Sequence, residues 1–314
     1  MRHAVRDWLG VYAPNGVVAV GLSGGADSSA LTAAAVAEAD AVDALVVDHG
    51  LQEGSAAVAA EAAAAALRLG CRSARVLAVR VSGGGGLEAA ARRARYAALD
   101  GAREGLPVLL GHTLDDQAET VLLGLARGSG ARSIQGMAAF ADPWGRPLLG
   151  VRRAVTRQLC ADIGLVPHED PHNSRAEFTR VRLRTEVLPL LEEVLGGGVA
   201  AALARTAAQL REDGALLDAL AENLLERARD GEGLAVEILA TAVPALRKRA
   251  IRAWLLDGGA KALTDKHLRA VDALVTDWRG QGGVAVGGGS DGTRLVAGRE
   301  HGTLILSLAE YEPR

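Results

Sequence analysis

The stretch VVAVGLSGGADSSAL, Val17 to Leu31, decides how the first half of the chain folds. A run of small apolar residues, typical of a strand buried on both faces, ends in Ser23-Gly24-Gly25-Ala26-Asp27-Ser28, and a helical pattern follows. Paired glycines at such a turn let the backbone approach an anion closely, and the amides of the first helical turn point at it. The stretch therefore predicts a phosphate-binding loop at the end of a buried strand.

Further apolar runs of strand length occupy residues 43–48, 74–79 and 107–112. Helical patterns follow the four runs, at 28–38, 55–69, 87–104 and 115–127. This alternation predicts an α/β fold with a doubly wound, mainly parallel sheet of the Rossmann type. Ligands of such sheets bind beyond the carboxyl ends of the strands, near a topological switch point. Chemistry is therefore expected in the segments GLSGGADS, VVDHGL and LLGHTLDD.

The second part of the chain has a different pattern. Helical stretches at 152–163 and 181–194 precede the glycines 196–198, and amphipathic stretches follow at 199–229, 245–257 and 265–278. The tail alternates short apolar runs with Gly and Asp, which is typical of β-hairpins. We predict one domain over residues 1–195 and a smaller, mostly helical domain over 196–314 that ends in β-hairpins.

Composition excludes several classes of protein. The 314 residues carry a net charge of −3, which gives no global nucleic-acid signal. The two cysteines, Cys71 and Cys160, lie too far apart for a Cys-x-x-Cys pair, which argues against a structural zinc or a cysteine-ligated cluster. No apolar stretch approaches the roughly 18–20 residues that span a bilayer. We expect a cytoplasmic protein with no membrane partner.

The loop at 23–28 is not one of the two commonest phosphate loops. The first lysine is Lys248, so the P-loop motif is absent, and the glycine spacing does not fit Gly-x-Gly-x-x-Gly. Asp27 is unusual, because a carboxylate beside a phosphate is repulsive unless a cation lies between them. It is predicted to contact magnesium or to act in catalysis; the alternative is an ordinary helix N-cap.

This loop resembles the pyrophosphate-binding loop, or PP-loop, of the N-type ATP pyrophosphatases, which split ATP between its α and β phosphates and adenylate a substrate. Three more segments resemble the tRNA(Ile)-lysidine synthetase family in its short form: VVDHGL (46–51), GHTLDDQAETVLLGLARGSG (111–130) and DPHNSRAEFTRVRLRTEVLPLL (170–191). Thr113 stands where the family often has a second histidine, and Val181 where it often has asparagine.

The resemblance implies a reaction. ATP adenylates the C2 oxygen of the wobble cytidine in an isoleucine tRNA with a CAU anticodon, and the ε-amine of free L-lysine then displaces AMP. The loop at 23–28 would hold the pyrophosphate, with Mg²⁺ spreading its charge. The expected co-substrate is ATP and the expected partners are tRNA and lysine; a homodimer is an open expectation.

Candidate site residues follow from the loops at the sheet edge. Catalysis is assigned to Asp27 and His112, and ATP binding to Ser23, Gly24, Gly25, Ala26, Asp27, Ser28, Asp48 and Arg127. Lysine binding is assigned to Asp116, Glu119 and Asp170. Structural alternatives stay open: a ring bonded to backbone for His112, a polar turn for Asp48, and a helix cap for Arg127. Asp116 and Glu119 could instead complement a helix dipole, and Asp170 could belong to an ordinary Asp-Pro turn. Asp115 is expected to cap the helix that it begins.

Basic clusters predict contacts with RNA phosphates. They comprise Arg92, Arg93, Arg95, Arg175, Arg180, Arg182, Arg184, Arg247, Lys248 and Arg249. The alternative for any one cluster is a solvated helix face paired with nearby acids. Two other functions stay open: a tRNA thiolase, which would need a catalytic or cluster-binding cysteine, and a non-catalytic nucleotide-binding module, which would have no use for Asp116 and Glu119.

Overall fold

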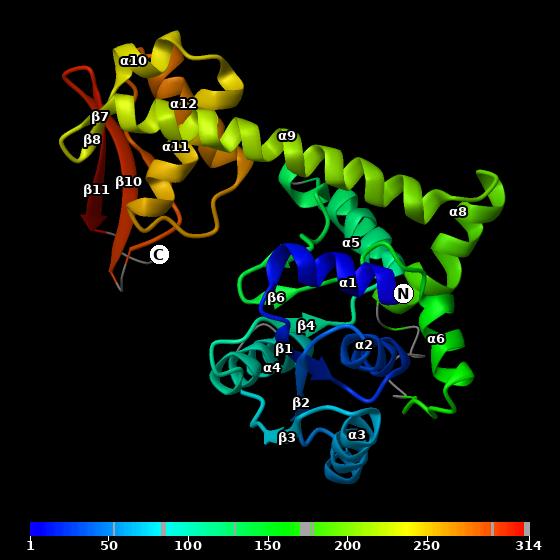
Figure 1. Ribbon diagram of the computed structural model, residues 1–314. Coiled ribbons are helices and arrows are strands. Elements are labelled where there is room, and N and C mark those ends of the chain that lie inside the picture. Colours follow the sequence, from blue (N-terminus) through cyan, green and yellow to red (C-terminus); the bar gives the residue numbers. More distant parts are fainter. Residues whose placement is uncertain are drawn as a thin grey trace. The chain divides into compact units, whose positions relative to one another are not determined.

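The computed structural model describes residues 1–52, 54–82, 86–128, 130–169, 177, 179–289 and 292–310. The chain divides into two compact units (Figure 1). Unit 1 comprises Met1–Ala126 and Gly136–Ala207, and unit 2 comprises Arg127–Gln135 and Ala208–Arg314. The division falls inside one continuous helix, α9 (Val199–Ala228).

Unit 1 contains a six-stranded sheet in the order β3-β2-β1-β4-β6-β5. Its strands are β1 (Val17–Leu22), β2 (Ala41–Asp48), β3 (Ser73–Ala78), β4 (Val108–Leu110), β5 (Phe140–Ala141) and β6 (Trp144–Gly145). All neighbouring pairs are parallel except β5 with β6. The predicted doubly wound, mainly parallel α/β fold is confirmed. Strands β5 and β6 were not predicted, because a two-residue strand has no periodicity to detect.

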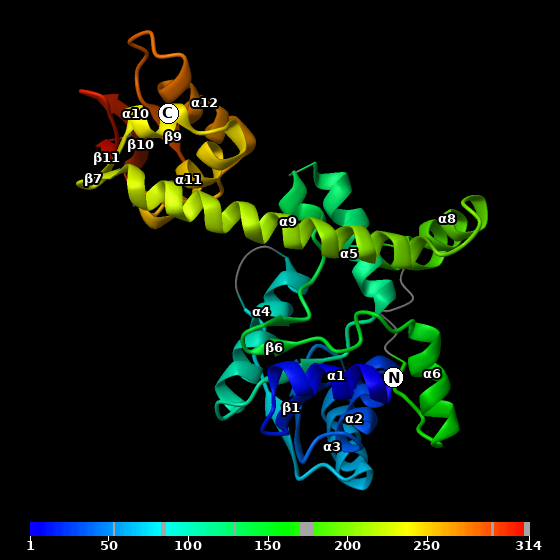
Figure 2. The same ribbon diagram turned by 45° about the horizontal axis from the view of Figure 1, so that its top comes forward.

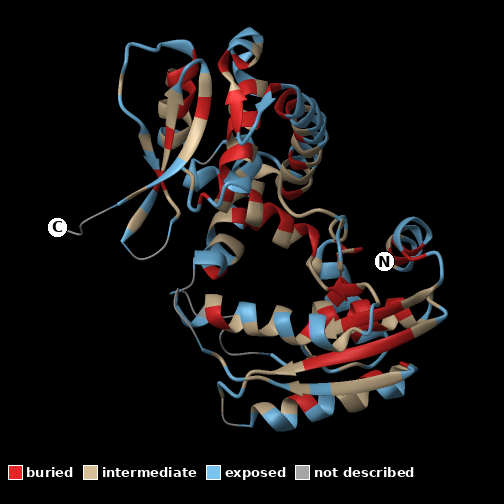
Figure 3. Ribbon diagram, turned by 90° about the vertical axis from the view of Figure 1, so that its left-hand side faces the viewer, coloured by how far each residue is buried: buried red, intermediate tan, exposed pale blue. Residues whose placement is uncertain are grey.

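Helices cover both faces of this sheet. They are α1 (Arg2–Tyr12), α2 (Ala26–Val36) and α3 (Ser55–Leu69) on one face and α4 (Leu87–Ala102) on the other. Alternate residues of β1 serve the two cores: Val18 and Val20 pack with the first group, whereas Ala19 packs with Leu99 of α4. The central strands are buried and the helices expose their outer sides (Figure 3). The chain reverses direction across the sheet between β1 and β4, which is the switch point.

Four more segments complete the frame of unit 1. They are α5 (Leu114–Arg127), α6 (Arg153–Asp162), α7 (Thr179–Arg182) and α8 (Leu188–Val194). A π-helical turn, Leu183–Val187, joins α7 to α8. Such turns are rare and often occur at functional sites.

Unit 2 combines helices with an antiparallel sheet ordered β7-β8-β11-β10-β9 (Figure 2). After α9 come β7 (Arg229–Asp230), β8 (Gly233–Ala235), α10 (Val236–Thr241), α11 (Pro244–Asp257), α12 (Asp265–Thr276), β9 (Val284–Val286), β10 (Thr293–Glu300) and β11 (Thr303–Glu310). The predicted helical region ending in hairpins is confirmed. Within the described residues no single helix is long and apolar enough to cross a membrane; only the pair Thr179–Val194 and Val199–Ala228, bent by 95°, meets that criterion jointly.

Candidate active site

The loop between β1 and α2 keeps its shape through its own hydrogen bonds. Gly24 has φ +80°, a left-handed conformation that favours glycine. The Ser28 hydroxyl accepts from the Ser23 amide at 3.1 Å and lies 3.0 Å from the Gly25 carbonyl and from the Ser23 hydroxyl. Amides in the first turn of a helix have no partner within that helix. The hydrogen bonds of Ser28 thus hold the loop in its shape before a ligand binds.

The end of β4 lies directly against this loop. A Cβ atom at Gly111 would come within 2.9 Å of the Asp27 carbonyl carbon and the Ser28 amide nitrogen. No side chain fits there without moving the first turn of α2. The segment that follows β4, with His112, is therefore held beside the phosphate loop at the switch point.

Three carboxylates gather around one guanidinium next to the loop. Arg153 of α6 places Nε 3.2 Å from Asp27 Oδ2, Nη2 2.6 Å from Asp116 Oδ1 and Nη1 3.4 Å from Glu119 Oε1. Arg184 of the π-helical turn adds a contact of 2.9 Å from its Nε to Glu119 Oε1. The Thr156 hydroxyl donates to Asp27.

The structure thus brings together Asp27, Asp116 and Glu119, as predicted, and adds Arg153, which the sequence analysis missed. Arg184 belongs here too, although it was assigned to RNA. One signal in the sequence could have indicated that such arginines were needed: three carboxylates at one sheet edge require cations when they are shielded from water. Glu119 is only 1% exposed.

Asp116 also caps its own helix. The amide and hydroxyl of Thr113 donate to Asp116 Oδ2 at 2.8 and 2.7 Å, and the Asp116 amide lies 3.4 Å from the Thr113 hydroxyl. This reciprocal pair is a capping box. Asp115 instead accepts from the amide of Arg153 at 2.7 Å, at the start of α6, so the expectation that it caps α5 is wrong.

The charge of Asp116 is stabilised despite its burial. Burial alone would raise the pKa of this carboxyl, but the Arg153 charge and the Thr113 hydrogen bonds outweigh it and hold the pKa below its ordinary value. Asp116 is therefore ionised at neutral pH and can attract a cation.

His112 is neutral at pH 7. Burial lowers the pKa of its imidazole to about 4, against the opposing charge of Asp116 and with help from Arg146 and Arg95. Its Nδ1 atom is buried and has no hydrogen-bond partner among the described residues. The alternative of a histidine whose ring bonds to backbone thus has no support at Nδ1, and the neutral ring presents an unpaired nitrogen beside the loop.

The remaining small-molecule candidates are less directly placed. Asp48 accepts from the Gly50 amide at 3.0 Å, which with Ser55 lowers the pKa of the carboxyl and fits a polar turn as well as a ribose contact. Arg127 occupies the last turn of α5, roughly 20 Å along the helix from Leu114; its contact with ATP stays a prediction, and this length weighs against it. Asp170 lies outside the described residues.

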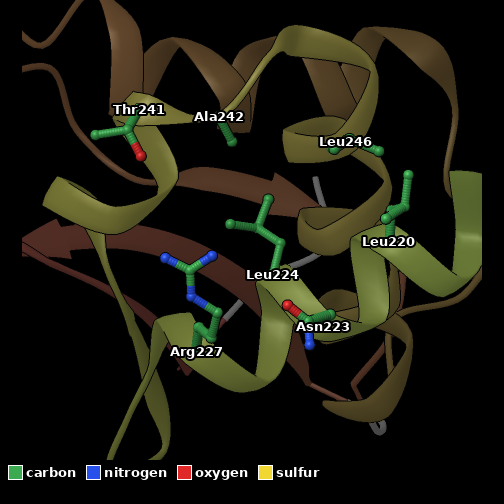
Figure 4. A pocket seen from close by; sticks show the side chains of 7 residues that line it. All are labelled: Leu220, Asn223, Leu224, Arg227, Thr241, Ala242 and Leu246. Carbon is green, nitrogen blue, oxygen red and sulfur yellow. The ribbon is translucent and has the colours of Figure 1, made fainter.

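The described residues form hollows large enough for a small ligand, including one in each unit. One, of about 390 Å³ in unit 1, is lined by Arg153 and Arg184 together with Asp115, Arg152, Leu188, Pro189 and Glu192, so it lies beside the carboxylate cluster. The other, of about 280 Å³, lies in unit 2 between α9 and the link from α10 to α11; Arg227, Asn223 and Thr241 are its polar residues (Figure 4).

In the part of the chain that the structure describes, no group of three or more His, Cys, Asp or Glu side chains is placed to hold a metal ion.

Comparison with known proteins agrees with this geometry. A family model described as "PP-loop domain" matches residues 3–191. A tRNA(Ile)-lysidine synthase from Nocardia farcinica is 76% identical over 315 residues, covering 100% of this chain and 99% of the relative. Another, from Rhodococcus erythropolis, is 70% identical over 311 residues, covering 99% and 95%.

The chain belongs to the tRNA(Ile)-lysidine synthase family. A second family model, "TilS substrate binding domain", matches residues 234–305 in unit 2. Among solved structures, a U34-tRNA thiolase from Methanococcus maripaludis aligns with a TM-score of 0.54 at 18% identity, covering 67% of this chain and 78% of that one. At that identity the likeness shows the shared fold alone.

The arginines assigned to RNA in this member of the lysidine synthase family fall into different environments. Arg92, Arg93, Arg180 and Arg182 are exposed, and Arg182 pairs with Glu186 at 2.9 Å one helical turn away. Arg95 is half-buried and stacks on Tyr96, with its guanidinium carbon 5.5 Å from the ring centre. Arg175 lies outside the described residues.

The basic cluster of α11 is partly structural. Arg247 is 5% exposed, and its Nε lies 2.6 Å from Asp272 Oδ1. The prediction that Arg247 contacts RNA is wrong, because its guanidinium fills a buried ion pair. Arg249 pairs with Asp218 at 2.6 Å, and Lys248 is half-buried; for these two, contact with RNA stays a prediction.

Proposed function

We propose that this chain ligates free lysine to C2 of the wobble cytidine in a CAU-anticodon isoleucine tRNA, through an adenylated intermediate, releasing AMP and pyrophosphate. One observation carries the proposal. Arg153 joins Asp27 of the phosphate loop to Asp116 and Glu119, so a site that already accepts cations adjoins the site that accepts phosphates. An ATP-dependent ligation of a cationic amino acid needs these two sites side by side.

The loop would hold the pyrophosphate end of ATP. Asp27 and the Ser23 hydroxyl are oxygen donors of the kind that suit Mg²⁺, which is usually held by one or two carboxylates and by substrate phosphates. When bound, the ion would neutralise charge on the leaving pyrophosphate. Asp27 is 26% exposed, so its carboxylate is accessible for this role.

The substrate amine must lose a proton before it attacks. At pH 7 only about one lysine ε-amine in 2,500 is neutral, given a reference pKa near 10.4. His112 lies beside the loop with Nδ1 unpaired and is the proposed acceptor of this proton. Because its pKa is about 4 without substrate, this role requires that the negative charge of bound phosphates raise that pKa. Asp116 and Glu119 would attract the lysine, which must then exchange with Arg153 or Arg184.

The thiolase alternative has no suitable cysteine. Cys71 and Cys160 are 7% and 1% exposed, and burial raises the pKa of both thiols, that of Cys71 to about 11. Neither supplies a thiolate at neutral pH.

We propose that residues 1–195 form the catalytic domain and that residues 196–314 form the tRNA-binding domain. We also propose a cytoplasmic location and a homodimer. The dimer is supported by Leu190, Val194 and Leu195, which leave an apolar face of α8 exposed, and light scattering of the purified chain tests it.

The decisive experiment is incorporation of labelled lysine into unmodified tRNA with a CAU anticodon, with and without ATP. We expect ATP-dependent label on the wobble cytidine and one AMP per lysine. The Asp27→Ala variant should bind ATP but form AMP at least about a hundredfold more slowly, whereas Asp162→Asn, an exposed change on α6, should be fully active. AMP formation without lysine incorporation would refute lysine as the nucleophile.

A further inference from the structure

Four buried side-chain nitrogens lack a hydrogen-bond partner among the described residues: His49 Nδ1, Arg95 Nε, His112 Nδ1 and Arg146 Nε. Buried polar groups in folded proteins are almost always paired, so each exception needs an explanation. One such atom could be accommodated as a local defect. Several near one edge of the sheet indicate a ligand: the two arginine Nε–H groups need acceptors, and each imidazole Nδ1 can donate or accept.

Three of the four nitrogens belong to residues at one edge of the sheet. His49, His112 and Arg146 follow β2, β4 and β6, which with β1 are neighbours in the sheet, and all three therefore lie at its carboxyl edge. Arg95 reaches this edge from α4. It stacks on Tyr96, whose ring packs edge-on at 4.6 Å against Trp144 of β6, next but one to Arg146.

Charge effects connect Arg95 with both histidines and Arg146 with His112. The positive charge of Arg95 helps burial to lower the pKa of both His49 and His112, and Arg146 acts on His112 in the same way. Arg180 and Arg92 in turn act on Arg95. The group is strongly basic.

The two carboxylates near the group are already engaged. Asp48, beside His49, accepts from the Gly50 amide, and Asp116, opposite His112, is held by Thr113 and Arg153. Neither pairs with the free nitrogens. Within the described residues no acceptor pairs with the Nε–H groups of Arg95 and Arg146, and an anion supplied by a bound ligand would fit them.

We propose that His49, Arg95 and Arg146 bind a backbone phosphate of the RNA next to the cytidine that is modified, and so position that base over the sheet edge. This inference rests on the proposed function. ATP already has a phosphate loop, and that loop starts α2 on the opposite face of the sheet from α4. The exposed Arg92, Arg93, Arg180 and Arg182 extend the basic surface outward, which a polyanion would use and a free nucleotide would not.

The first test uses Arg95→Gln and Arg146→Gln, with Arg103→Gln as the matched control. Arg103 directly follows α4 and pairs with Asp100 at 2.7 Å, away from the cluster. We expect each test variant to raise KM for the RNA about ten- to a hundredfold, the usual effect of losing a charged hydrogen bond, with KM for ATP and lysine unchanged. Arg95→Lys keeps the charge and should retain part of the affinity. A rise in KM for ATP or lysine instead would overturn the proposal.

The second test removes the partner rather than the arginine. Anticodon stem-loops that carry one neutral methylphosphonate at a time are bound to the wild-type protein and to Arg95→Gln. At one phosphate beside the cytidine, the neutral group should weaken binding to wild type but have no further effect on the variant. Additive losses at every phosphate would refute the contact. Because binding requires no turnover, this result stands even if lysine is not incorporated, which would refute only the proposed reaction.

Discussion

Removal of Arg153 should destabilise unit 1 strongly at neutral pH. Its side chain is 13% exposed and contacts Asp27, Asp116 and Glu119, whose side chains are 26%, 15% and 1% exposed. Breaking a buried ion pair from one side typically costs about 3–5 kcal/mol, because a charge is left buried without its partner. Arg184 still contacts two of the carboxylates, so we expect Arg153→Gln to cost about 3 kcal/mol at pH 7.

This cost should shrink as the pH falls. In the wild type the pKa of Asp116 is depressed, so its stabilising charge is fully present above the unfolded pKa of about 3.9 and is lost only below it. Without Arg153, burial becomes the main influence and raises the pKa of Asp116. The variant then takes up a proton at a higher pH than the wild type does, and its deficit in the free energy of unfolding is smaller at pH 5 than at pH 7.

Hydrogen exchange of the α5 and α6 amides measures this effect within unit 1. Exchange should be roughly a hundredfold faster in Arg153→Gln at pH 7, since about 1.4 kcal/mol corresponds to a factor of ten. Arg152→Gln is the matched control, because Arg152 is 46% exposed and its pairs with Asp115 and Glu192 should contribute at most about 1 kcal/mol. Equal losses in the two variants, or a loss independent of pH, would refute the role of Arg153 as the shared cation.

Three further changes test the site. Asp27→Ala should reduce AMP formation at least about a hundredfold with little change in ATP binding by filtration. Gly111→Ala should weaken ATP binding, because the new Cβ would lie 2.9 Å from the Ser28 amide, whereas Gly101→Ala, with no atom within 4 Å, should not. The pKa of His112 is about 4, below its unfolded value near 6.5, so stability is full above pH 6.5 and falls towards pH 4; His112→Gln should flatten that part of the stability curve and slow lysine transfer. Unchanged activity in the histidine variant would exclude it as the proton acceptor.

The fold was predictable because its signals are local. The β1 run and the periodic helices 55–69 and 199–229 appear in the structure as β1, α3 and α9, with bounds shifted by at most a residue. The edge that carries the site was predictable from the parallel arrangement, since parallel strands end together. The strand order, in which β1 and β4 flank the switch point, comes from the structure.

The pairing of charges was not predictable in this way. Arg153 lies 126 residues from Asp27, and nothing in its neighbourhood marks it as different from Arg152. Arg247 was misassigned for the same reason, because a buried Arg–Asp pair and an exposed basic helix look alike in sequence. Residue type gives the charge of a side chain, whereas its partner and its burial depend on the packing of distant elements.

The distribution of charge at the sheet edge has a consequence for the order of events. On one side lie three carboxylates already neutralised by Arg153 and Arg184, and around His112 lies the basic group with unpaired nitrogens. The unpaired nitrogens of the basic group have no partner to give up among the described residues, whereas the carboxylates must first exchange an arginine for the ammonium group of lysine. Electrostatics therefore favours binding of the RNA before lysine. Binding of RNA in the absence of lysine, together with a lower KM for lysine when RNA is present, would agree with this order.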